Sequence, residues 1–323
     1  MKDDKDEMTV HILSTEGVKT AEIEGEILNR DSVQSSIRRK LGLSTTRRSI
    51  EPGEAGVAEL MIAVYTKYDV PLTHKELNHW NVELMQERTD LEHKGAYRIH
   101  ADPMQIVSGG LGRGKVHFEA LPSKNVTNEM KQFIIWFNDS LNTLPPLTRA
   151  GMAHLYSVSI HPYEDGNGRM ARALVKKALS QSTNAPALSG LSRQIATKKS
   201  SYYDALEKNN QELEITDWLL YFAETVIDAK EYTLMSVERI AQKGVLYKKF
   251  GTELNERQKK VINKLYEAEP EGFEGGLSAK NYIAITKASR ATTTRDLKKL
   301  VDLGILQISG TRRFARYSLS ESR

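Results

Sequence analysis

The feature that most constrains this chain is the stretch "HPYEDGNGRMARALVKKAL", which covers residues 161–179. Its first twelve residues hold a histidine, two carboxylates, two glycines around an asparagine and two arginines, and an apolar helical pattern follows at once. The apolar pattern is typical of a buried helix, whereas this much polar chemistry at its entrance is typical of a ligand site. These residues therefore predict a buried helix that begins at a binding site.

Residues 165–168, "DGNG", have the composition of an anion cradle. Glycines let successive backbone N–H groups converge on one point. The first amides of the helix expected from about Arg169 lack intrahelical partners and carry the positive end of its dipole. Arg169 and Arg172 lie three residues apart and so share a helix face. Two guanidiniums beside a glycine nest indicate a polyphosphate rather than a single phosphate.

Two more side chains add the chemistry of group transfer. Asp165 could hold a hard cation that bridges phosphate oxygens, which favours Mg²⁺. His161 could take a proton from an incoming hydroxyl if its imidazole is neutral. Taken singly, the histidine is typical of a structural residue, "GNG" of a turn and the arginines of a solvated face. Their occurrence together favours phosphoryl or nucleotidyl transfer, and the segment is not a P-loop because no G-x-x-x-x-G-K-[ST] occurs.

Composition limits the class of protein. The chain has 323 residues, 39% hydrophobic and 27% charged, and no apolar run approaches the roughly 18 residues of a membrane span. Its first residues are acidic and polar, unlike a secretory signal. It has no cysteine, which excludes disulfides, thiolate metal sites and a cysteine nucleophile. We expect a cytoplasmic protein without a membrane partner.

The body of the chain, from about residue 18 to residue 242, is expected to be mainly α-helical. Residues 95–126 are rich in glycine and contain two short β-type runs, "MQIVSG" and "KVHFEA", which predict one β-hairpin. Residues 44–56 are typical of a loop. We expect three parts: an N-terminal region over residues 1–45, a catalytic domain over 46–242 and a C-terminal domain over 251–323.

The C-terminal part shows helix, helix, helix and a basic hairpin, the order of a winged helix-turn-helix. Residues 280–323 hold ten Lys/Arg and three Asp/Glu, which indicates an anionic partner, while an ordinary solvated basic face stays open as the alternative. The partner could be DNA or a protein. The cations expected to contact it are Arg295, Lys298 and Lys299 on the third helix and Arg312, Arg313 and Arg316 in the hairpin.

Residues 161–172 closely resemble the signature of the Fic family, H-P-F-x-[DE]-G-N-G-R-x-x-R. The one departure is Tyr163 in place of phenylalanine, and a hydroxyl at that core position needs a partner. The resemblance implies a Fic/Fido helical bundle with a small β-hairpin flap. It also implies transfer of AMP from ATP to a hydroxyl side chain of a target protein, or of the enzyme itself, with release of pyrophosphate.

The same resemblance assigns roles to individual residues. His161 would be the base, Asp165 would hold Mg²⁺, Arg169 would contact the phosphates of ATP and Arg172 its γ-phosphate. The anion hole would be lined by Gly166, Asn167 and Gly168. A target segment would dock by strand addition on the flap residues Val116, His117, Phe118 and Glu119. Adenine would lie between Tyr203 and Asn210, although a Tyr–Tyr pair on a helix is usually core.

Residues 20–25, "TAEIEG", fit the inhibitory pattern [ST]-x-x-x-E-[GN] of Fic proteins that carry their own inhibitory helix. An N-terminal copy resembles the second class of the family. Glu24 would pair with Arg172, so that ATP binds only in an unproductive pose. Thr20 and Gly25 would position the helix end. The chain begins close to this switch, which leaves open whether native residues precede it.

Three alternatives stay open. The chain could be a DNA-binding transcriptional regulator that uses its Fic-like body as a sensor or dimerisation module. Some relatives use the inhibitory glutamate to remove AMP, and others transfer phosphate or other nucleotide moieties. A Doc-like kinase is expected to depart from the motif at its glycine and arginine positions, which favours AMP transfer here. Homodimers are frequent in the family, but no heptad pattern in this sequence indicates one.

Overall fold

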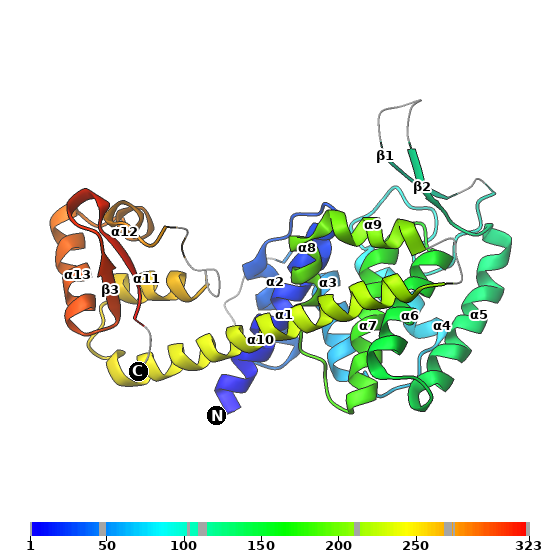
Figure 1. Ribbon diagram of the computed structural model, residues 1–323, viewed down its shortest axis with the longest axis horizontal. Coiled ribbons are helices and arrows are strands. Elements are labelled where there is room, and N and C mark those ends of the chain that lie inside the picture. The colour runs from blue at the N-terminus through cyan, green and yellow to red at the C-terminus, as the bar shows by residue number, and fades with distance from the viewer. Residues whose placement is uncertain are drawn as a thin grey trace. The chain divides into compact units, whose positions relative to one another are not determined.

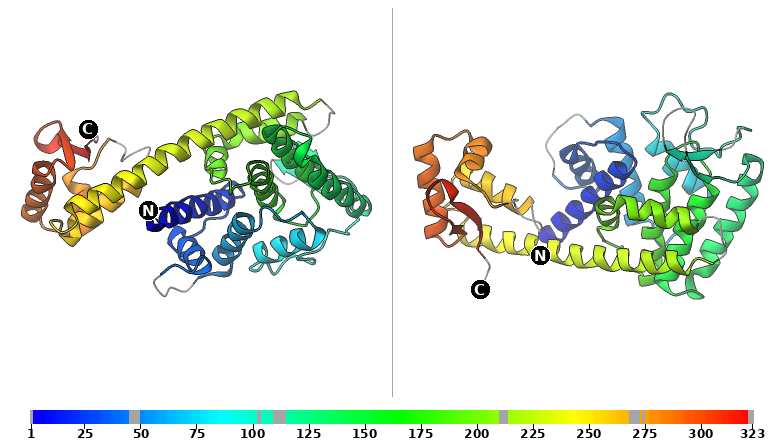
Figure 2. Two further views of the ribbon diagram at one scale, coloured as in Figure 1. Left: turned by 90° about the horizontal axis from the view of Figure 1, so that it is seen from below. Right: turned by 45° about the horizontal axis from the view of Figure 1, so that its top comes forward.

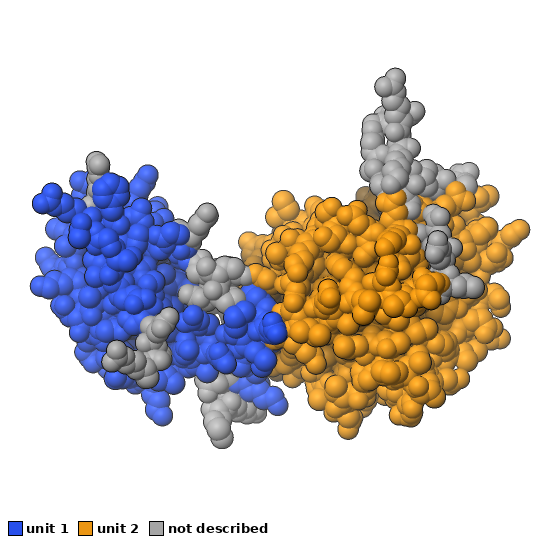
Figure 3. All heavy atoms as spheres, in the orientation of Figure 1, with its two compact units in different colours: residues 1–8, 231–323 blue, residues 9–230 orange. Residues whose placement is uncertain are grey.

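The computed structural model describes residues 2–44, 50–101, 104–108, 115–209, 214–267, 273 and 275–320. The chain forms two compact units, shown in different colours in Figure 3. Unit 2 comprises residues 9–230, and unit 1 comprises residues 1–8 and 231–323. The boundaries expected at residues 45, 242 and 251 stay predictions.

Unit 2 is a helical body with one small hairpin (Figure 1). Its helices are α1 (Lys2–Ile23, in this unit from residue 9), α2 (Arg30–Lys40), α3 (Pro52–Thr66), α4 (His74–Leu84), α5 (Ser123–Asp139), α6 (Pro146–Ile160), α7 (Asn167–Thr183), α8 (Leu191–Thr197), α9 (Lys199–Asn209) and the first part of α10 (Thr216–Phe250). The short 3-10 helix η1 (Ser140–Asn142) follows α5. The mainly α-helical fold is thus confirmed.

Helix α7 lies at the centre of unit 2 and is buried on all its faces. Its apolar residues, among them Met170, Leu174 and Val175, join the core. Four cationic side chains on α7 are buried as well, and a buried charge is costly unless it is paired. Lys177 meets Glu76 at 3.0 Å, and two of the others lie at the N-terminal entrance. The fold therefore supplies acidic and carbonyl partners around this helix.

One buried arginine ties the surrounding helices together. Arg149 on α6 is fully buried and donates hydrogen bonds to four acceptors: Ser140 Oγ, Phe137 O, Ala178 O and Gln181 Oε1, at 2.7–3.1 Å. Burial lowers its pKa to about 10, so the guanidinium stays charged at neutral pH. Arg149 therefore joins the end of α5 and η1 to the C-terminal half of α7.

The hairpin expected in residues 95–126 is present and projects from the helices of unit 2 (Figure 1). Strands β1 (Gln105–Ser108) and β2 (Lys115–Glu119) pair antiparallel, with Ile106 opposite Phe118 and a register shift after Ile106. In contrast, two expected boundaries differ from the structure. Helix α1 begins at Lys2 rather than near residue 18, and α3 begins at Pro52, inside the expected loop. Proline at the first helical position is a start signal that the loop-like composition concealed.

Unit 1 holds the rest of α10 with α11 (Glu256–Glu267), α12 (Ala279–Thr286), α13 (Arg290–Asp302), β3 (Leu306–Ser309), η2 (Arg312–Phe314) and β4 (Arg316–Leu319). The two strands pair antiparallel, with Leu306 opposite Leu319. A separate apolar cluster forms the core of this unit and includes Val261, Tyr282 and Leu300. Among the described residues, no helix combines the length and hydropathy needed to cross a membrane.

Candidate functional site

The turn between α6 and α7 carries the sequence motif. Helix α6 ends at His161, which adopts a left-handed conformation with φ 51°, and α7 is preceded by Gly166 with φ 86°. Few side chains tolerate positive φ, so the glycine allows this tight entrance. The first intrahelical bond of α7 runs from Met170 N–H to Gly166 O, at 3.0 Å. The amides of residues 167–169 therefore precede the hydrogen-bonded helix and are suited to an anion.

A buried arginine outside the motif braces this turn. Arg98 donates from Nε to His161 O at 2.7 Å and from Nη2 to Leu121 O at 2.6 Å, and its backbone N–H bonds to Pro162 O at 3.0 Å. Only 1% of Arg98 is exposed. It thus links the chain after the flap to the end of α6. Sequence reasoning missed Arg98, because it lies in an irregular segment with no periodic pattern.

The imidazole of His161 is buried and neutral. Burial lowers its pKa to about 4, so its imidazole is uncharged at neutral pH. Its Nδ1 atom is buried and has no hydrogen-bond partner among the described residues. The ring of Phe118, on flap strand β2, lies 6.2 Å from the imidazole, centroid to centroid. The histidine therefore lies beside strand β2 of the hairpin.

The inside of the motif turn is held by two polar side chains. The amide of Asn167 accepts from Tyr163 N–H at 2.9 Å and donates to Tyr163 O at 2.8 Å. The buried hydroxyl of Tyr163 donates to Asn78 Oδ1 at 2.8 Å, so the departure from the family motif has its partner. Because the side chain of Asn167 is already bonded, only its backbone N–H is offered to a ligand.

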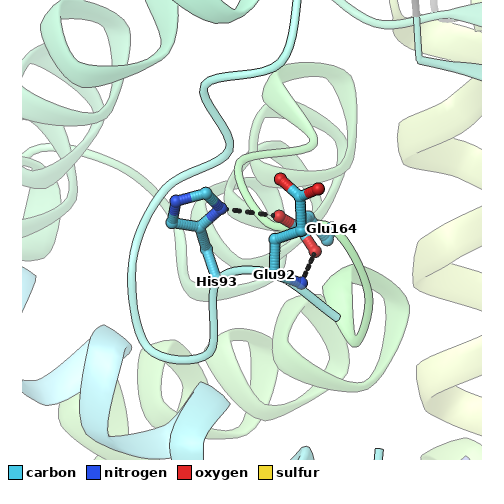
Figure 4. Close-up of side chains that lie close together, drawn as sticks. All are labelled: Glu92, His93 and Glu164. Carbon is cyan, nitrogen blue, oxygen red and sulfur yellow. Dashed lines mark hydrogen bonds and ion pairs between the residues drawn. The ribbon is translucent and has the colours of Figure 1, made fainter. Parts of the chain in front are cut away.

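Glu164 ties a second loop to the motif. It lies with Glu92 and His93 in the arrangement of a three-residue metal site (Figure 4). Its carboxylate accepts from His93 Nδ1 at 3.0 Å and from Glu92 N–H at 2.9 Å. Although burial acts to raise it, these hydrogen bonds hold the pKa of Glu164 below its usual value. Both of its oxygens are engaged in bracing the loop, so we interpret the group as structural.

The carboxylate of Asp165 pairs with arginine side chains of the protein. Its Oδ1 accepts from Gly166 N–H at 2.5 Å and lies 3.7 Å from Arg169 Nη2, and its Oδ2 pairs with Arg88. Its side chain is 33% exposed. One accessible carboxylate beside a phosphate cradle fits Mg²⁺, which prefers few carboxylates and completes its shell with phosphate and water. Sequence reasoning missed Arg88, because it lies 77 residues from its partner.

Arg172 is held by the end of α1. Its Nη2 lies 2.7 Å from Glu24 Oε1 and donates to Thr20 O at 2.9 Å, while its Nε donates to Thr20 Oγ1 at 2.7 Å. Figure 2 shows α1, in dark blue, reaching the green helices of the body. The remaining nitrogen of the guanidinium, Nη1, is buried and has no hydrogen-bond partner among the described residues. A phosphate oxygen fits that vacant donor.

Arg169 is held by a residue that sequence reasoning missed. Its Nη1 lies 2.6 Å from Glu26 Oε2, and its Nε is buried without a partner among the described residues. Beside it, Gly168 leaves room for Glu24: a Cβ at position 168 would lie 2.2 Å from Glu24 Oε1. The glycine therefore permits the close approach of a charged oxygen to the start of α7.

The expected adenine and flap residues are only partly described. Tyr203 is 36% exposed, and its hydroxyl lies 3.4 Å from Ile23 O. Its neighbour Tyr202 is the buried member of the pair. Asn210 lies outside the described residues, as do the side chains of Val116 and His117 on β2. Phe118 is buried, whereas Glu119 is exposed.

Comparison with known families finds matches for two segments of the chain. Residues 71–179 match the model of the Fic/DOC family, a segment that holds the flap, α6 and the motif turn. Residues 1–43 match a second model, a domain of unknown function (DUF4172). Residues 71–179 are thus similar to the Fic/DOC family, and the chain shows distant similarity to Fic adenylyltransferases.

The curated relatives match over short segments. Protein adenylyltransferase fic-1 of Caenorhabditis elegans is 33% identical over 93 residues, which is 28% of this chain and 18% of that protein. Protein adenylyltransferase Fic of Drosophila erecta is 32% identical over 117 residues, 35% of this chain and 22% of that protein. The matched segments therefore span about a fifth of these relatives.

Solved structures resemble the fold. The match to a Fic family protein from Desulfovibrio desulfuricans G20 covers 97% of this chain and 88% of that protein, with a TM-score of 0.53 and 18% sequence identity. The match to a Fic domain containing signaling protein from Bacteroides thetaiotaomicron covers 75% of this chain and 91% of that protein, with a TM-score of 0.57 and 18% sequence identity. At such low sequence identity the similarity concerns the fold alone.

Proposed function

We propose that this protein is a self-inhibited protein adenylyltransferase, which transfers AMP from ATP to a hydroxyl side chain of a target protein. One observation carries the proposal. Two buried guanidiniums at the entrance of α7, those of Arg169 and Arg172, each keep a buried nitrogen without a partner among the described residues. A neutral histidine lies at the same turn. Buried unpaired donors are costly, so their presence indicates a ligand rich in acceptors, such as a triphosphate.

The proposed reaction needs one proton acceptor and a stabilised leaving group. The imidazole of His161 takes the proton of the target hydroxyl while the hydroxyl oxygen attacks the α-phosphorus of ATP. The new P–O bond forms as the bond from that phosphorus to the bridging oxygen breaks, and pyrophosphate leaves. Arg169, Arg172 and the first amides of α7 hold the negative charge that shifts toward pyrophosphate. Asp165 would hold Mg²⁺, which neutralises phosphate charge when it is bound.

Binding and docking complete the proposal. We assign adenine to the neighbourhood of Tyr203 and Asn210, and the target segment to the flap strand that carries Phe118. Strand addition suits this hairpin, because an extended segment would use main-chain hydrogen bonds and require no particular side chain at most positions. The contact between Phe118 and His161 supports this assignment, since it brings the flap to the base.

The inhibitory part of the proposal rests on α1. Glu24 occupies the guanidinium of Arg172, which the γ-phosphate needs, so ATP cannot bind productively while α1 is docked. The pair is strong because the side chain of Arg172 is 2% exposed and Thr20 holds it in place. This contact supports the proposal that the protein belongs to the second inhibitory class of the Fic family.

Labelled ATP tests the proposed activity. With Mg²⁺ present, we expect wild type to incorporate almost no ³²P, and Glu24→Gly to label itself strongly from α-³²P-ATP but not from γ-³²P-ATP. We expect this labelling because loss of the Glu24 carboxylate frees the guanidinium of Arg172 to bind the γ-phosphate. Retention of γ label would instead indicate a kinase. A Glu24→Gly variant that binds ATP yet retains neither label would refute nucleotidyl and phosphoryl transfer to itself.

A second candidate function, duplex DNA binding, is favoured by the outer face of α13. Arg290, Thr294, Arg295 and Lys298 are all exposed on this helix. Asp296, in contrast, is buried, and it accepts from Arg257 at 2.8 Å and from Tyr282 at 3.0 Å. The acidic side chain is thus neutralised inside the unit while the exposed face stays cationic. We propose that residues 251–323 are a winged helix-turn-helix with α13 as its DNA-contacting helix.

Fluorescence polarisation with a labelled duplex tests this candidate. If about four phosphates are contacted, affinity should fall about 100-fold between 50 and 200 mM salt. Arg295→Gln should weaken binding, whereas Lys260→Gln, an equal loss of charge at an exposed position on α11, should change it less. Binding that is absent at low salt would refute the candidate and favour a protein partner for this unit.

A further inference from the structure

We propose that Glu26 is a second inhibitory carboxylate, which occupies Arg169 as Glu24 occupies Arg172. The end of α1 would then act as an intramolecular substitute for a polyphosphate and fill two successive positions of the cradle. The inference rests on the proposed function, because it takes both arginines as phosphate ligands. It adds a residue that lies outside the pattern [ST]-x-x-x-E-[GN], which ends at Gly25.

The contact itself has the geometry of a charge-assisted hydrogen bond. Arg169 Nη1 lies 2.6 Å from Glu26 Oε2, and the side chain of Arg169 is only 2% exposed. The other carboxylate near Arg169, that of Asp165, lies further away at 3.7 Å. Among the described residues the carboxylate of Glu26 has no other hydrogen-bond or ion-pair partner. Its carboxylate is therefore the principal neutraliser of a buried charge, although Glu26 itself is 36% exposed.

The local backbone explains how two carboxylates reach two arginines. Helix α1 ends in a Schellman motif, in which Glu26 N–H bonds to Ala21 O and Gly25 N–H bonds to Glu22 O, both at 3.0 Å. Gly25 supplies the left-handed residue, with φ 88°. The motif reverses the chain at the helix end, so residues on both sides of the glycine face α7. Their targets lie one helical turn apart on α7, at positions 169 and 172.

The end of α1 offers the cradle a set of acceptors that resembles a phosphate chain. Arg172 donates to the hydroxyl and carbonyl oxygens of Thr20 and to one carboxylate oxygen of Glu24. Arg169 donates to one carboxylate oxygen of Glu26. Carbonyls at a helix C-terminus carry the negative end of the helix dipole. The negative end of α1 therefore faces the positive entrance of α7, and the two charges are complementary.

The two carboxylates are expected to exclude different parts of a nucleotide. Arg169 lies in the first turn of α7, and its Nη2 is 3.7 Å from Oδ1 of Asp165, the proposed metal ligand, so Glu26 would compete with the phosphates that ADP and ATP share. Arg172 lies one turn further along, so Glu24 competes only with a phosphate chain long enough to reach it. Loss of Glu26 should therefore improve binding of ADP, whereas loss of Glu24 should not.

Titration calorimetry of the full chain with ADP and Mg²⁺ separates these roles. We expect Glu26→Gln to bind ADP about fivefold more tightly than wild type, because a half-exposed ion pair contributes about 1 kcal/mol. Glu24→Gln should leave ADP affinity within about twofold of wild type. The matched control is Glu22→Gln, which removes a carboxylate that contacts Lys19 in the same part of α1.

The outcomes distinguish the inference from the proposed function. An ADP affinity of Glu26→Gln equal to that of wild type and Glu22→Gln overturns the role of Glu26, even if Glu24→Gly transfers AMP. A fivefold gain without any AMP transfer supports the second carboxylate while the proposed activity fails. Absence of ADP binding in every variant, including the Glu24→Gln/Glu26→Gln double variant, overturns both.

Discussion

Replacing His161 with alanine in the Glu24→Gly background should slow AMP transfer by about 10²–10⁴-fold, the usual contribution of a general base. ATP affinity should stay nearly unchanged, because the guanidiniums of Arg169 and Arg172 remain in place. The comparison is made with α-³²P-ATP at saturating ATP, with calorimetry for binding. A double variant that transfers AMP within threefold of Glu24→Gly would show that another group removes the proton.

The same reaction should show an unusual dependence on pH. Burial lowers the pKa of His161 from an ordinary value near 6.5 to about 4, so the imidazole stays a free base well below neutral pH. Because the group acts in its deprotonated form, kcat/KM for ATP in Glu24→Gly should hold from pH 7 to about pH 5 and fall only near pH 4. A fall centred at pH 6.5 would contradict the neutral, buried histidine.

The second large effect concerns stability. Arg149→Met should lower the free energy of unfolding by about 3–5 kcal/mol, because several buried acceptors lose their donor at once. They include Phe137 O and Ala178 O, which Arg149 bonds at 2.7 and 3.0 Å. For a unit of this size the loss corresponds to a fall in Tm of roughly 10 °C, measured by calorimetry.

The control for this prediction is another arginine on a helix of the same unit. Arg39 on α2 is exposed, so Arg39→Met makes the same substitution at the surface, where no buried acceptor loses its donor. Its effect should stay within about 0.5 kcal/mol. Equal losses in the two variants would mean that the hydrogen bonds of Arg149 contribute little to the net stability of the fold.

Much of the fold could be predicted because local patterns determine it. The central helix was expected from about Arg169 and begins at Asn167, since glycine and a polar entrance mark a helix start. The hairpin was predictable because its short apolar runs alternate with glycine-rich segments. Helix α1 was expected too late in the chain, since its first turns are acidic and polar, and charged residues are compatible with either a helix or a coil.

The candidate site was predictable only where its residues are neighbours in sequence. The motif residues lie within one turn and one helix, so their spacing alone indicated a cradle. Arg88 and Arg98 reach that turn from a segment with no periodicity, and Glu26 reaches it through a chain reversal at Gly25. Such partners depend on how helices pack, which no local pattern encodes.

The anchoring of α1 has a consequence for how the proposed inhibitory contacts open. Two turns before Glu24, the buried carboxylate of Glu16 accepts from Ser192 N–H at 2.9 Å and lies 3.4 Å from Lys176 Nζ. This anchor is far better protected than Glu24 and Glu26, whose side chains are 28% and 36% exposed. The last turn of α1 can therefore fray while the rest of the helix remains docked. Local opening of one helical turn costs much less than global unfolding, so a few residues at the end of α1 can open and close repeatedly while the body stays folded.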